Sequence, residues 1–188
     1  MQTQTTEIPG VLLLTGRYFN DARGYFVETY SVRAARDAGL MAEFVQDNQA
    51  LSLKRGTVRA LHFQVPPKGQ AKLVRVLRGS VYDVAVDLRA GSPSYGRWIA
   101  ATLTARGGEQ IFVPRGFAHG YCTLEDETEV AYKVDDYYAP DCERGIAWND
   151  PILNIGWPVS AVDAVLSDKD RKLPRFADFA SPFRYDGE

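Results

Sequence analysis

The stretch TVRALHFQVPPKGQAKLVRVLRGSVYDVAVDL, residues 57–88, decides the fold class. Apolar and polar residues alternate within it in three bursts, at 57–65, 71–79 and 80–88. A period of two places successive side chains on opposite faces of an extended chain, which is typical of β-strands with one buried face. The segment VPPKGQ interrupts the first two bursts, and proline and glycine favour turns. This stretch therefore predicts three short strands joined by turns.

The same alternation recurs later in the chain, at 97–103, 110–114, 120–124 and 129–134. Helical spacing is convincing only at 31–40, where Ser31 is placed to cap the helix. A double-sheet jelly roll accommodates many short strands and protects their edges. We therefore predict an all-β fold, a jelly-roll sandwich or barrel with a few short helices, in one domain spanning residues 1–188. The segment after Pro151 is expected to wrap around it.

The composition argues against several classes of partner. The formal net charge of −2, with basic residues scattered through loops, indicates no nucleic-acid or anionic membrane surface. Cys122 and Cys142 form no CxxC pair, so we expect free thiols in a reducing compartment. No basic region precedes the short apolar run near the first residue, and no segment approaches the roughly 20 apolar residues of a membrane span. We expect a cytoplasmic protein.

Two spacings resemble the conserved patterns of the cupin superfamily. Gly108, Pro114, Gly116 and His119 match the second cupin pattern, with Thr123 in its last place. The first pattern keeps its frame but loses its ligands, because glutamine and lysine stand where cupins have a second histidine and a glutamate. First-row metals prefer imidazole and carboxylate ligands, and an ammonium group repels a divalent cation. We therefore expect no metal, and a pocket with a fixed positive charge.

His62 stands inside one of the predicted strands, where leucine or valine would close the core. The plainest interpretation is a core imidazole that bonds a backbone carbonyl. Three neighbours favour a pocket instead: Gln64 shares its face, Lys72 opens the next strand, and His119 is directed toward the same cavity by the cupin frame. Strict alternation puts Arg59 on the opposite face of the strand. Either the strand bends there or Arg59 reaches a ligand from the rim.

Several longer motifs together resemble the dTDP-4-dehydrorhamnose 3,5-epimerase family. These are FVQDNQALSLKRGTVRALHFQ, AKLVRVLRGSVYDVAVDLR, FVPRGFAHGY, YKVDDYYAPDCERGIAWND and LSDKD. The similarity runs over roughly residues 7–172, in the family's order and spacing. It implies a jelly-roll homodimer that needs no cofactor. It also implies that the enzyme inverts carbons 3 and 5 of dTDP-4-dehydro-6-deoxyglucose, on the route to dTDP-L-rhamnose.

The resemblance implies catalytic roles that suit the chemistry. Inversion next to a ketone needs a base, an acid on the other face, and stabilisation of the enolate oxygen. The resemblance implies that His62 is the base and that Asp170 supports it, although Asp168 is a second candidate for that partner. It also implies that Tyr132 is the acid, against an ordinary strand tyrosine as the alternative. We expect Lys72, with Arg59, to stabilise the enolate.

The resemblance also implies residues that hold the nucleotide. Tyr138 matches the residue that stacks on thymine. The other positions that match dTDP-sugar contacts of the family are Arg23, Glu28, Gln46, Asp47, Asn48, His119, Glu143 and Lys169. Plainer interpretations exist for some of them, since Arg23 with Glu28 could be a surface ion pair, residues 46–48 a turn, and Lys169 a solvated charge. Phe19 and Phe26 could wall the pocket, but aromatic core is the simpler expectation.

Two features depart from the family. Its usual RGLHFQ is RALHFQ here, so Ala60 replaces a glycine and is expected to tighten the pocket slightly. One extra residue separates WP (157–158) from SDKD (167–170), which bears on the choice between the two aspartates. Two other classes also remain, a metal-dependent cupin oxygenase and a non-catalytic sugar-binding cupin.

Overall fold

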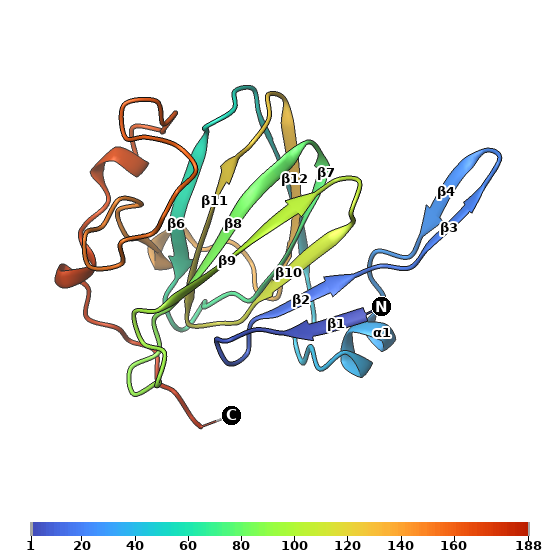
Figure 1. Ribbon diagram of the computed structural model, residues 1–188. Coiled ribbons are helices and arrows are strands. Elements are labelled where there is room, and N and C mark those ends of the chain that lie inside the picture. Colours follow the sequence, from blue (N-terminus) through green and yellow to red (C-terminus); the bar gives the residue numbers. More distant parts are fainter. Residues whose placement is uncertain (1, 188) are drawn as a thin grey trace.

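The computed structural model describes residues 2–187, which form thirteen strands and a few short helices (Figure 1). The strands are β1 (Gln2–Thr5), β2 (Leu12–Thr15), β3 (Tyr18–Asp21), β4 (Gly24–Val27), β5 (Gln46–Ser52), β6 (Val58–Gln64), β7 (Lys72–Arg78), β8 (Ser80–Asp87), β9 (Trp98–Thr104), β10 (Glu109–Val113), β11 (Phe117–Thr123), β12 (Thr128–Val134) and β13 (Glu143–Gly145). The helices are α1 (Val32–Asp37) and the 3₁₀ turns η1 (Pro140–Cys142), η2 (Asp170–Lys172) and η3 (Phe176–Asp178). Each predicted strand is confirmed.

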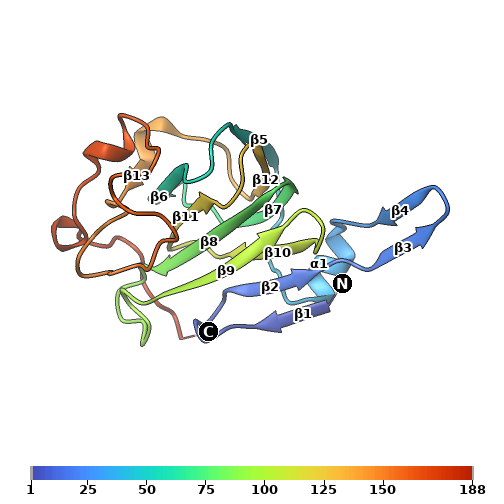
Figure 2. The same cartoon turned by 45° about the horizontal axis from the view of Figure 1, so that its top comes forward.

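Two antiparallel sheets make up the body of the molecule (Figures 1 and 2). One sheet has the order β1-β2-β10-β7-β12-β5, and the other has the order β13-β6-β11-β8-β9. Apart from the consecutive pairs β1–β2 and β8–β9, neighbouring strands within each sheet are not consecutive in the sequence, as in a jelly roll. The all-β jelly-roll prediction is confirmed. The predicted helix is shorter than expected, but Ser31 does cap it by accepting a hydrogen bond from the Ala34 amide.

The main core lies between the two sheets. Val74, Ile111 and Val130 of the larger sheet pack in one cluster with Val81 and Leu103 of the smaller sheet. Each of these side chains is almost completely withdrawn from solvent, which is the dominant favourable term in holding such a sandwich together. One end of this interior is lined by polar side chains instead of aliphatic ones.

A second cluster covers the outer face of the smaller sheet. Phe63 and Val84 pack there against Trp148, Leu153 and Phe183 from the C-terminal part of the chain. Figure 1 shows this part, coloured orange and red, lying beside β6 and covering that flank. The predicted wrapping of the segment after Pro151 is confirmed, and it brings η2 next to β6.

The hairpin β3–β4 projects away from the body of the molecule in both views (Figures 1 and 2). Its aromatic side chains Phe19, Tyr25 and Phe26 are 52%, 64% and 69% exposed. The expectation that Phe19 and Phe26 belong to the core was therefore wrong, and they do not wall the cavity of their own chain within residues 2–187. Over the same residues, none of the helices is long and apolar enough to span a bilayer.

Strand β6 contains a β-bulge at its centre. His62 pairs with His119 of β11, but Arg59 pairs with Tyr121, so two residues of β6 face the single Gly120. Ala60 is fully buried there within the outer cluster. The expectation that Ala60 tightens the pocket was wrong, because its methyl group lies against Gly120 and not in the cavity.

Candidate active site

A cavity of about 420 Å³ opens at the polar end of the sandwich. Its lining comes from both sheets and from η2, and it includes Arg59, His62, Lys72, His119, Tyr121, Tyr132 and Asp170. Convergence of titratable side chains from several elements on one concave site is typical of an active site. These residues form the candidate active site.

The closest polar pair in the cavity joins β6 to η2. The Nε2 atom of His62 lies 2.5 Å from Oδ1 of Asp170. The Asp170 side chain is buried, whereas that of His62 is 27% exposed to the cavity. Because a carboxylate only accepts hydrogen bonds, Nε2 provides the proton of this contact when the imidazole has a single proton. This leaves Nδ1 with its lone pair. Asp168 is exposed, so Asp170 is the aspartate that contacts His62.

Arg59 reaches the same cavity as His62 because of the bulge. The extra residue in β6 reverses the alternation between them, so both line the cavity. Of the two alternatives left open by the sequence, the strand bends. The Arg59 guanidinium is tied to β5, since Nε donates to the Ser52 hydroxyl at 3.2 Å and a terminal nitrogen donates to the Leu51 carbonyl at 3.2 Å. A fixed cation therefore stands at the wall of the cavity.

Lys72 supplies the second cation, from the first residue of β7. Its Nζ donates to the His62 carbonyl oxygen at 3.3 Å. Burial lowers the pKa of Lys72 to about 8, while the negative charges of Asp83 and Glu143 act in the opposite direction. Burial thus disfavours the charged form of Lys72. The residue stands in the position where cupins have a metal ligand.

His119 forms a second imidazole–carboxylate pair in the floor of the cavity. Its Nε2 lies 2.9 and 3.0 Å from the two oxygens of Asp83, and both side chains are buried. Burial lowers the pKa of His119, although Asp83 opposes that shift. Sequence reasoning missed Asp83. A charged residue inside the apolar run VYDVAV was the available signal, because carboxylates are rarely buried without a partner.

Two phenols complete the lining. Burial raises the pKa of Tyr132, and the neighbouring Arg59 partly offsets the shift, so its hydroxyl is protonated at neutral pH. Tyr121, which sequence reasoning did not single out, is 4% exposed. Burial raises the pKa of Tyr121 to about 12. Its hydroxyl is near Ser52 but makes no hydrogen bond of normal geometry among residues 2–187.

A smaller cavity of about 160 Å³ adjoins the first and shares His62, Lys72 and Tyr132 with it. Its other lining residues include Gln46, Asn48, Tyr138 and Glu143. The Tyr138 hydroxyl donates to one oxygen of Glu143 at 2.9 Å, and Lys169 Nζ lies 2.6 Å from the other. Burial favours a higher pKa for Glu143, but the contacts with Lys169 and Tyr138 outweigh it and lower that pKa. The Glu143 carboxylate thus connects the segment that carries Tyr138 to Lys169, the residue before η2.

Comparison with known proteins identifies the chain. The family model described as dTDP-4-dehydrorhamnose 3,5-epimerase matches residues 5–178. The chain belongs to the dTDP-4-dehydrorhamnose 3,5-epimerase family. The curated enzyme of that name from Shigella flexneri is 45% identical over 179 residues, covering 95% of this chain and 97% of the relative. Like the other members of this epimerase family, the protein is an isomerase.

Solved structures of the epimerase family share the fold. A Bacillus anthracis enzyme with TDP and PPi bound is 46% identical, with a TM-score of 0.90 over 93% of this chain and 98% of that one. A Legionella pneumophila enzyme in complex with dTDP-4-keto-L-rhamnose is 36% identical, with a TM-score of 0.92 over 98% of each chain. The cupin-like jelly roll is therefore shared by proteins that hold thymidine nucleotides.

Three residues that the epimerase family resemblance selected lie outside the two cavities described above. Asp47 points to the outer face of β5, where it pairs with Lys133 at 2.7 Å, because side chains alternate along a strand. Arg23 is at the tip of the projecting hairpin and pairs with Asp21 at 2.6 Å. Glu28, just after β4, is exposed. The alternative of an Arg23–Glu28 ion pair was wrong, and so was that of a turn at residues 46–48, which form a strand.

The remaining predicted positions come together. Tyr138, Glu143 and Lys169 are joined by the contacts above, and Gln46 donates to the Asn48 side chain at 2.9 Å beside them. Lys169 is therefore not merely a solvated charge, because it forms an ion pair with Glu143. Within residues 2–187, no three histidine, cysteine, aspartate or glutamate side chains are grouped so as to hold a metal ion.

Proposed function

We propose that the protein inverts carbons 3 and 5 of dTDP-4-dehydro-6-deoxy-D-glucose to give dTDP-4-dehydro-L-rhamnose, a step of dTDP-L-rhamnose biosynthesis. Membership of the epimerase family supports the reaction and the nucleotide-sugar substrate. The Legionella pneumophila relative, which was crystallised with the corresponding keto-sugar nucleotide, supports the same substrate class.

One observation carries the mechanism: base and acid come from opposite sheets. His62 stands on β6 of the five-stranded sheet, and Tyr132 stands on β12 of the six-stranded sheet. Both line the same cavity. A sugar ring held between the sheets then has an imidazole on one face and a phenol on the other. Inversion of a carbon requires this arrangement, since the proton must leave and return on different faces.

His62 takes the proton in this mechanism. Its Nε2–H donates to Asp170, which fixes the tautomer and presents Nδ1 as the basic nitrogen. Removing a proton from the carbon next to the ketone breaks the C–H bond, and its electron pair moves to the carbonyl oxygen. The imidazolium that results is stabilised by the Asp170 carboxylate 2.5 Å away.

Lys72 and Arg59 stabilise the enolate. Each lines the cavity with a cationic group that is already held in place before the substrate arrives. A cation that is already in place interacts most strongly with charge that develops in the transition state, and the effect is larger for the partly buried Lys72 than for the exposed Arg59. Lys72 occupies the position of a metal ligand in cupins. It then provides the positive charge that the metal would provide in a metal-dependent cupin.

Tyr132 returns the proton. Its phenol is protonated at neutral pH because burial raises its pKa. When the enolate collapses, its electron pair forms a new C–H bond with the phenolic proton, on the face opposite His62. Each inversion thus moves one proton to His62 and takes one from Tyr132, and exchange with water restores both groups.

Labelling in deuterated water tests this function. Incubation with dTDP-4-dehydro-6-deoxyglucose is expected to place deuterium at carbons 3 and 5, detected by NMR or mass spectrometry. His62→Asn should abolish incorporation while keeping nucleotide affinity. Label at one carbon only would identify a single-centre epimerase. Binding without any label would indicate a sugar-binding protein. An activity that depends on metal retained through purification without chelator would indicate a cupin oxygenase.

We also propose a homodimer in which the β3–β4 hairpin of one subunit completes the site of the other. The hairpin exposes three aromatic rings and projects from the body of the molecule, and Arg23 lies in its turn, outside the cavity of its own chain. Arginine binds a diphosphate with two hydrogen bonds at once, which suits Arg23 of the partner subunit to the nucleotide. Free thiols at Cys122 and Cys142 support a location in the cytoplasm.

Mixing two inactive variants tests the exchange of hairpins. Arg23→Ala and His62→Asn subunits, co-refolded in equal amounts, are expected to recover about a quarter of the wild-type activity, because half of the dimers would hold one intact site. If Arg23 served the site of its own chain, the mixture would stay inactive. A monomer mass by light scattering would also contradict the proposal.

A further inference from the structure

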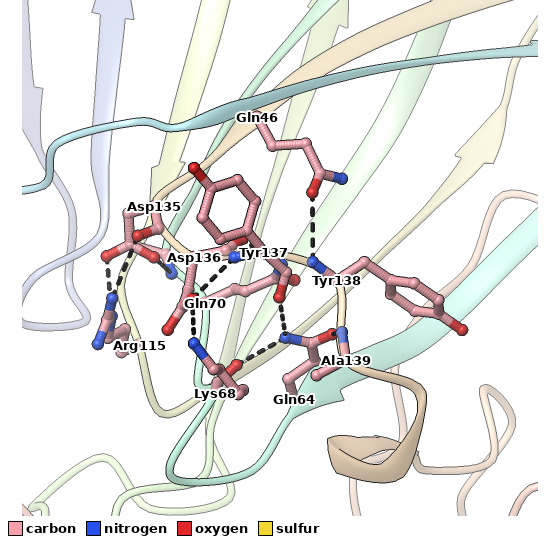
Figure 3. Close-up of polar contacts among 11 residues, drawn as sticks. Gln46, Gln64, Lys68, Gln70, Arg115, Asp135, Asp136, Tyr137, Tyr138 and Ala139 are labelled. Carbon is pink, nitrogen blue, oxygen red and sulfur yellow. Dashed lines mark hydrogen bonds and ion pairs between the residues drawn. The ribbon is translucent and has the colours of Figure 1, made fainter.

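The segment 136–139 is held in place by three glutamine side chains (Figure 3). This segment follows β12 and carries Tyr138. Gln46 accepts a hydrogen bond from the Tyr138 amide at 3.2 Å, and Gln70 donates to the Asp136 carbonyl at 2.7 Å. The third glutamine, Gln64, stands at the end of β6, two residues after His62. The backbone of the segment is thus bonded from three separate elements.

Gln64 makes the largest number of these contacts. Its Nε2 donates to the carbonyl oxygens of Lys68, at 2.6 Å, and Tyr137, at 3.2 Å, while its Oε1 accepts from the Ala139 amide at 2.7 Å. The residue is 4% exposed. A carboxamide has two N–H donors, and both are occupied here. Gln64 therefore has no donor left for a ligand in the adjoining cavity, and each of its hydrogen bonds goes to the backbone.

Ion pairs fix the base of the same segment. Lys68 Nζ lies 3.0 Å from Asp136, and Arg115 Nε lies 2.8 Å from Asp135, the residue before the segment (Figure 3). Asp135 also accepts a hydrogen bond from the Ala71 amide at 2.7 Å. These contacts hold one end of the segment, so Gln64 and Gln46 determine the conformation of the other end.

The side chain that this backbone presents is that of Tyr138. Its ring points away from the glutamines in Figure 3, is 56% exposed, and donates through its hydroxyl to Glu143 at 2.9 Å. An exposed ring on an ordered backbone is ready to stack on a nucleobase. Ordering such a ring before the ligand arrives improves affinity, because the entropy cost has already been met during folding.

We propose that Gln64 is a positioning residue, which fixes the segment 136–139 and thereby sets the affinity for the nucleotide through Tyr138. This inference rests on the proposed function, in which Tyr138 stacks on the thymine base. Gln64 stands where a cupin has its second histidine ligand. Here it binds the segment that carries Tyr138, the residue proposed to stack on thymine.

A double-mutant cycle tests the proposal. The dissociation constant of dTDP is measured by calorimetry for the wild type, Gln64→Leu, Tyr138→Ala and the double variant. Gln64→Leu is expected to weaken binding about tenfold, equivalent to about 1.4 kcal/mol. In the Tyr138→Ala background the same change is expected to cost less than about twofold, because its target is gone. Equal losses in both backgrounds would overturn the proposal.

The kinetic readout separates positioning from general damage. Gln64→Leu should raise the KM for the nucleotide sugar and leave kcat at saturation near the wild-type value, since the cation and base positions are retained. A fall in kcat with unchanged KM would contradict the inference. Gln49→Leu is the control for the side-chain change. Gln49 lies on the outer face of β5, where its side chain bonds Glu129 at 3.3 Å, and its loss should alter neither parameter.

A milder variant covers the case in which Gln64→Leu fails to fold. Gln70→Leu removes one hydrogen bond from the same segment, at Asp136, and is expected to weaken dTDP binding by a smaller factor in the same direction. In this variant, hydrogen exchange should be faster than in the wild type at the Tyr138 and Ala139 amides, and unchanged in β7 and β12. If the wild type binds no dTDP, the proposed function itself fails. If Tyr138→Ala binds dTDP as well as the wild type does, this inference is overturned.

Discussion

Arg59 and His62 line one cavity although strict alternation would place them on opposite faces of β6. The cause is the bulge, in which two residues of β6 face the single Gly120 of β11. Bulges redirect side chains without breaking a sheet, and they are frequent next to active sites. The positions of Arg59 and His62 in the proposed mechanism therefore depend on this bulge. Gly120 contributes to the site because its missing side chain leaves room for the bulge.

Replacing Gly120 by alanine tests that dependence. A Cβ atom at this position would lie 2.7 Å from the Ala60 Cα and 2.9 Å from the Arg59 carbonyl oxygen, and closer still to the Ala60 methyl group. Because the neighbouring atoms are backbone, they can move only by disturbing the bulge. We expect Gly120→Ala to lower the free energy of unfolding by about 1–3 kcal/mol and to reduce kcat.

Urea unfolding and the deuterium-exchange assay provide the measurement. Gly156→Ala is the matched control, because a Cβ atom there would meet nothing within 4 Å. The control should stay within about 0.5 kcal/mol of the wild type. If the two variants behave alike, the bulge tolerates a side chain at position 120 and does not depend on glycine there.

The limits of sequence reasoning follow from particular residues. Strands β6 to β12 were predictable because their apolar faces repeat every second residue. Strand β5 was not, because its sequence QDNQALS places polar side chains toward both solvent and the cavity. A period of two also assumes that the strands pair without interruption. It therefore left two alternatives for Arg59, a bent strand or a place at the rim, and could not locate the bulge. Partners such as Asp83 depend on register between strands, which alternation alone does not provide.

Lys72 predicts a pH dependence of activity. Its ammonium form is the one that stabilises an enolate, and burial lowers its pKa to about 8. Because this pKa is that of the ligand-free protein, we expect kcat/KM to fall as the pH rises through this value, whereas Tyr132, whose pKa is raised, titrates higher. Lys72→Arg keeps the positive charge to a much higher pH, so its alkaline limb should move upward even if its maximal rate is lower. An unchanged limb in that variant would assign the titration to another group.

The same shift predicts a pH dependence of stability. Between pH 8 and 10.5 the unfolded chain retains a proton on Lys72 that the folded protein has released. Stability rises with pH wherever the unfolded state binds more protons, so the cost of burying this ammonium group is relieved across that window. The free energy of unfolding of the wild type, measured relative to Lys72→Met at each pH, should therefore increase from pH 8 upward. A constant or falling difference would contradict the lowered pKa.

Tyr121 offers a prediction with the opposite sign from most core substitutions. Its hydroxyl is buried without a hydrogen-bond partner among the described residues. Removing such a group relieves a desolvation cost, so Tyr121→Phe should leave the free energy of unfolding unchanged or raise it by up to about 1 kcal/mol. Thr128→Val provides the contrast, because the buried Thr128 hydroxyl donates to the Glu125 carbonyl at 2.9 Å and its loss should cost about 1 kcal/mol. Urea unfolding of both variants decides the matter, and a clear loss for Tyr121→Phe would mean that its hydroxyl is satisfied.

The two neighbouring aspartates give the sharpest test of the base. Asp170 is buried against His62, whereas Asp168 is exposed, so the same change of charge can be made in and out of contact with the imidazole. Asp170→Asn replaces the carboxylate by an amide that can favour the other tautomer and no longer stabilises the imidazolium. We expect kcat for deuterium incorporation to fall about a hundredfold or more, within the range for loss of general-base catalysis. Asp168→Asn should retain the wild-type rate. Because both variants remove one negative charge from the same turn, equal losses would point to the general electrostatic field of the turn and not to the His62–Asp170 contact.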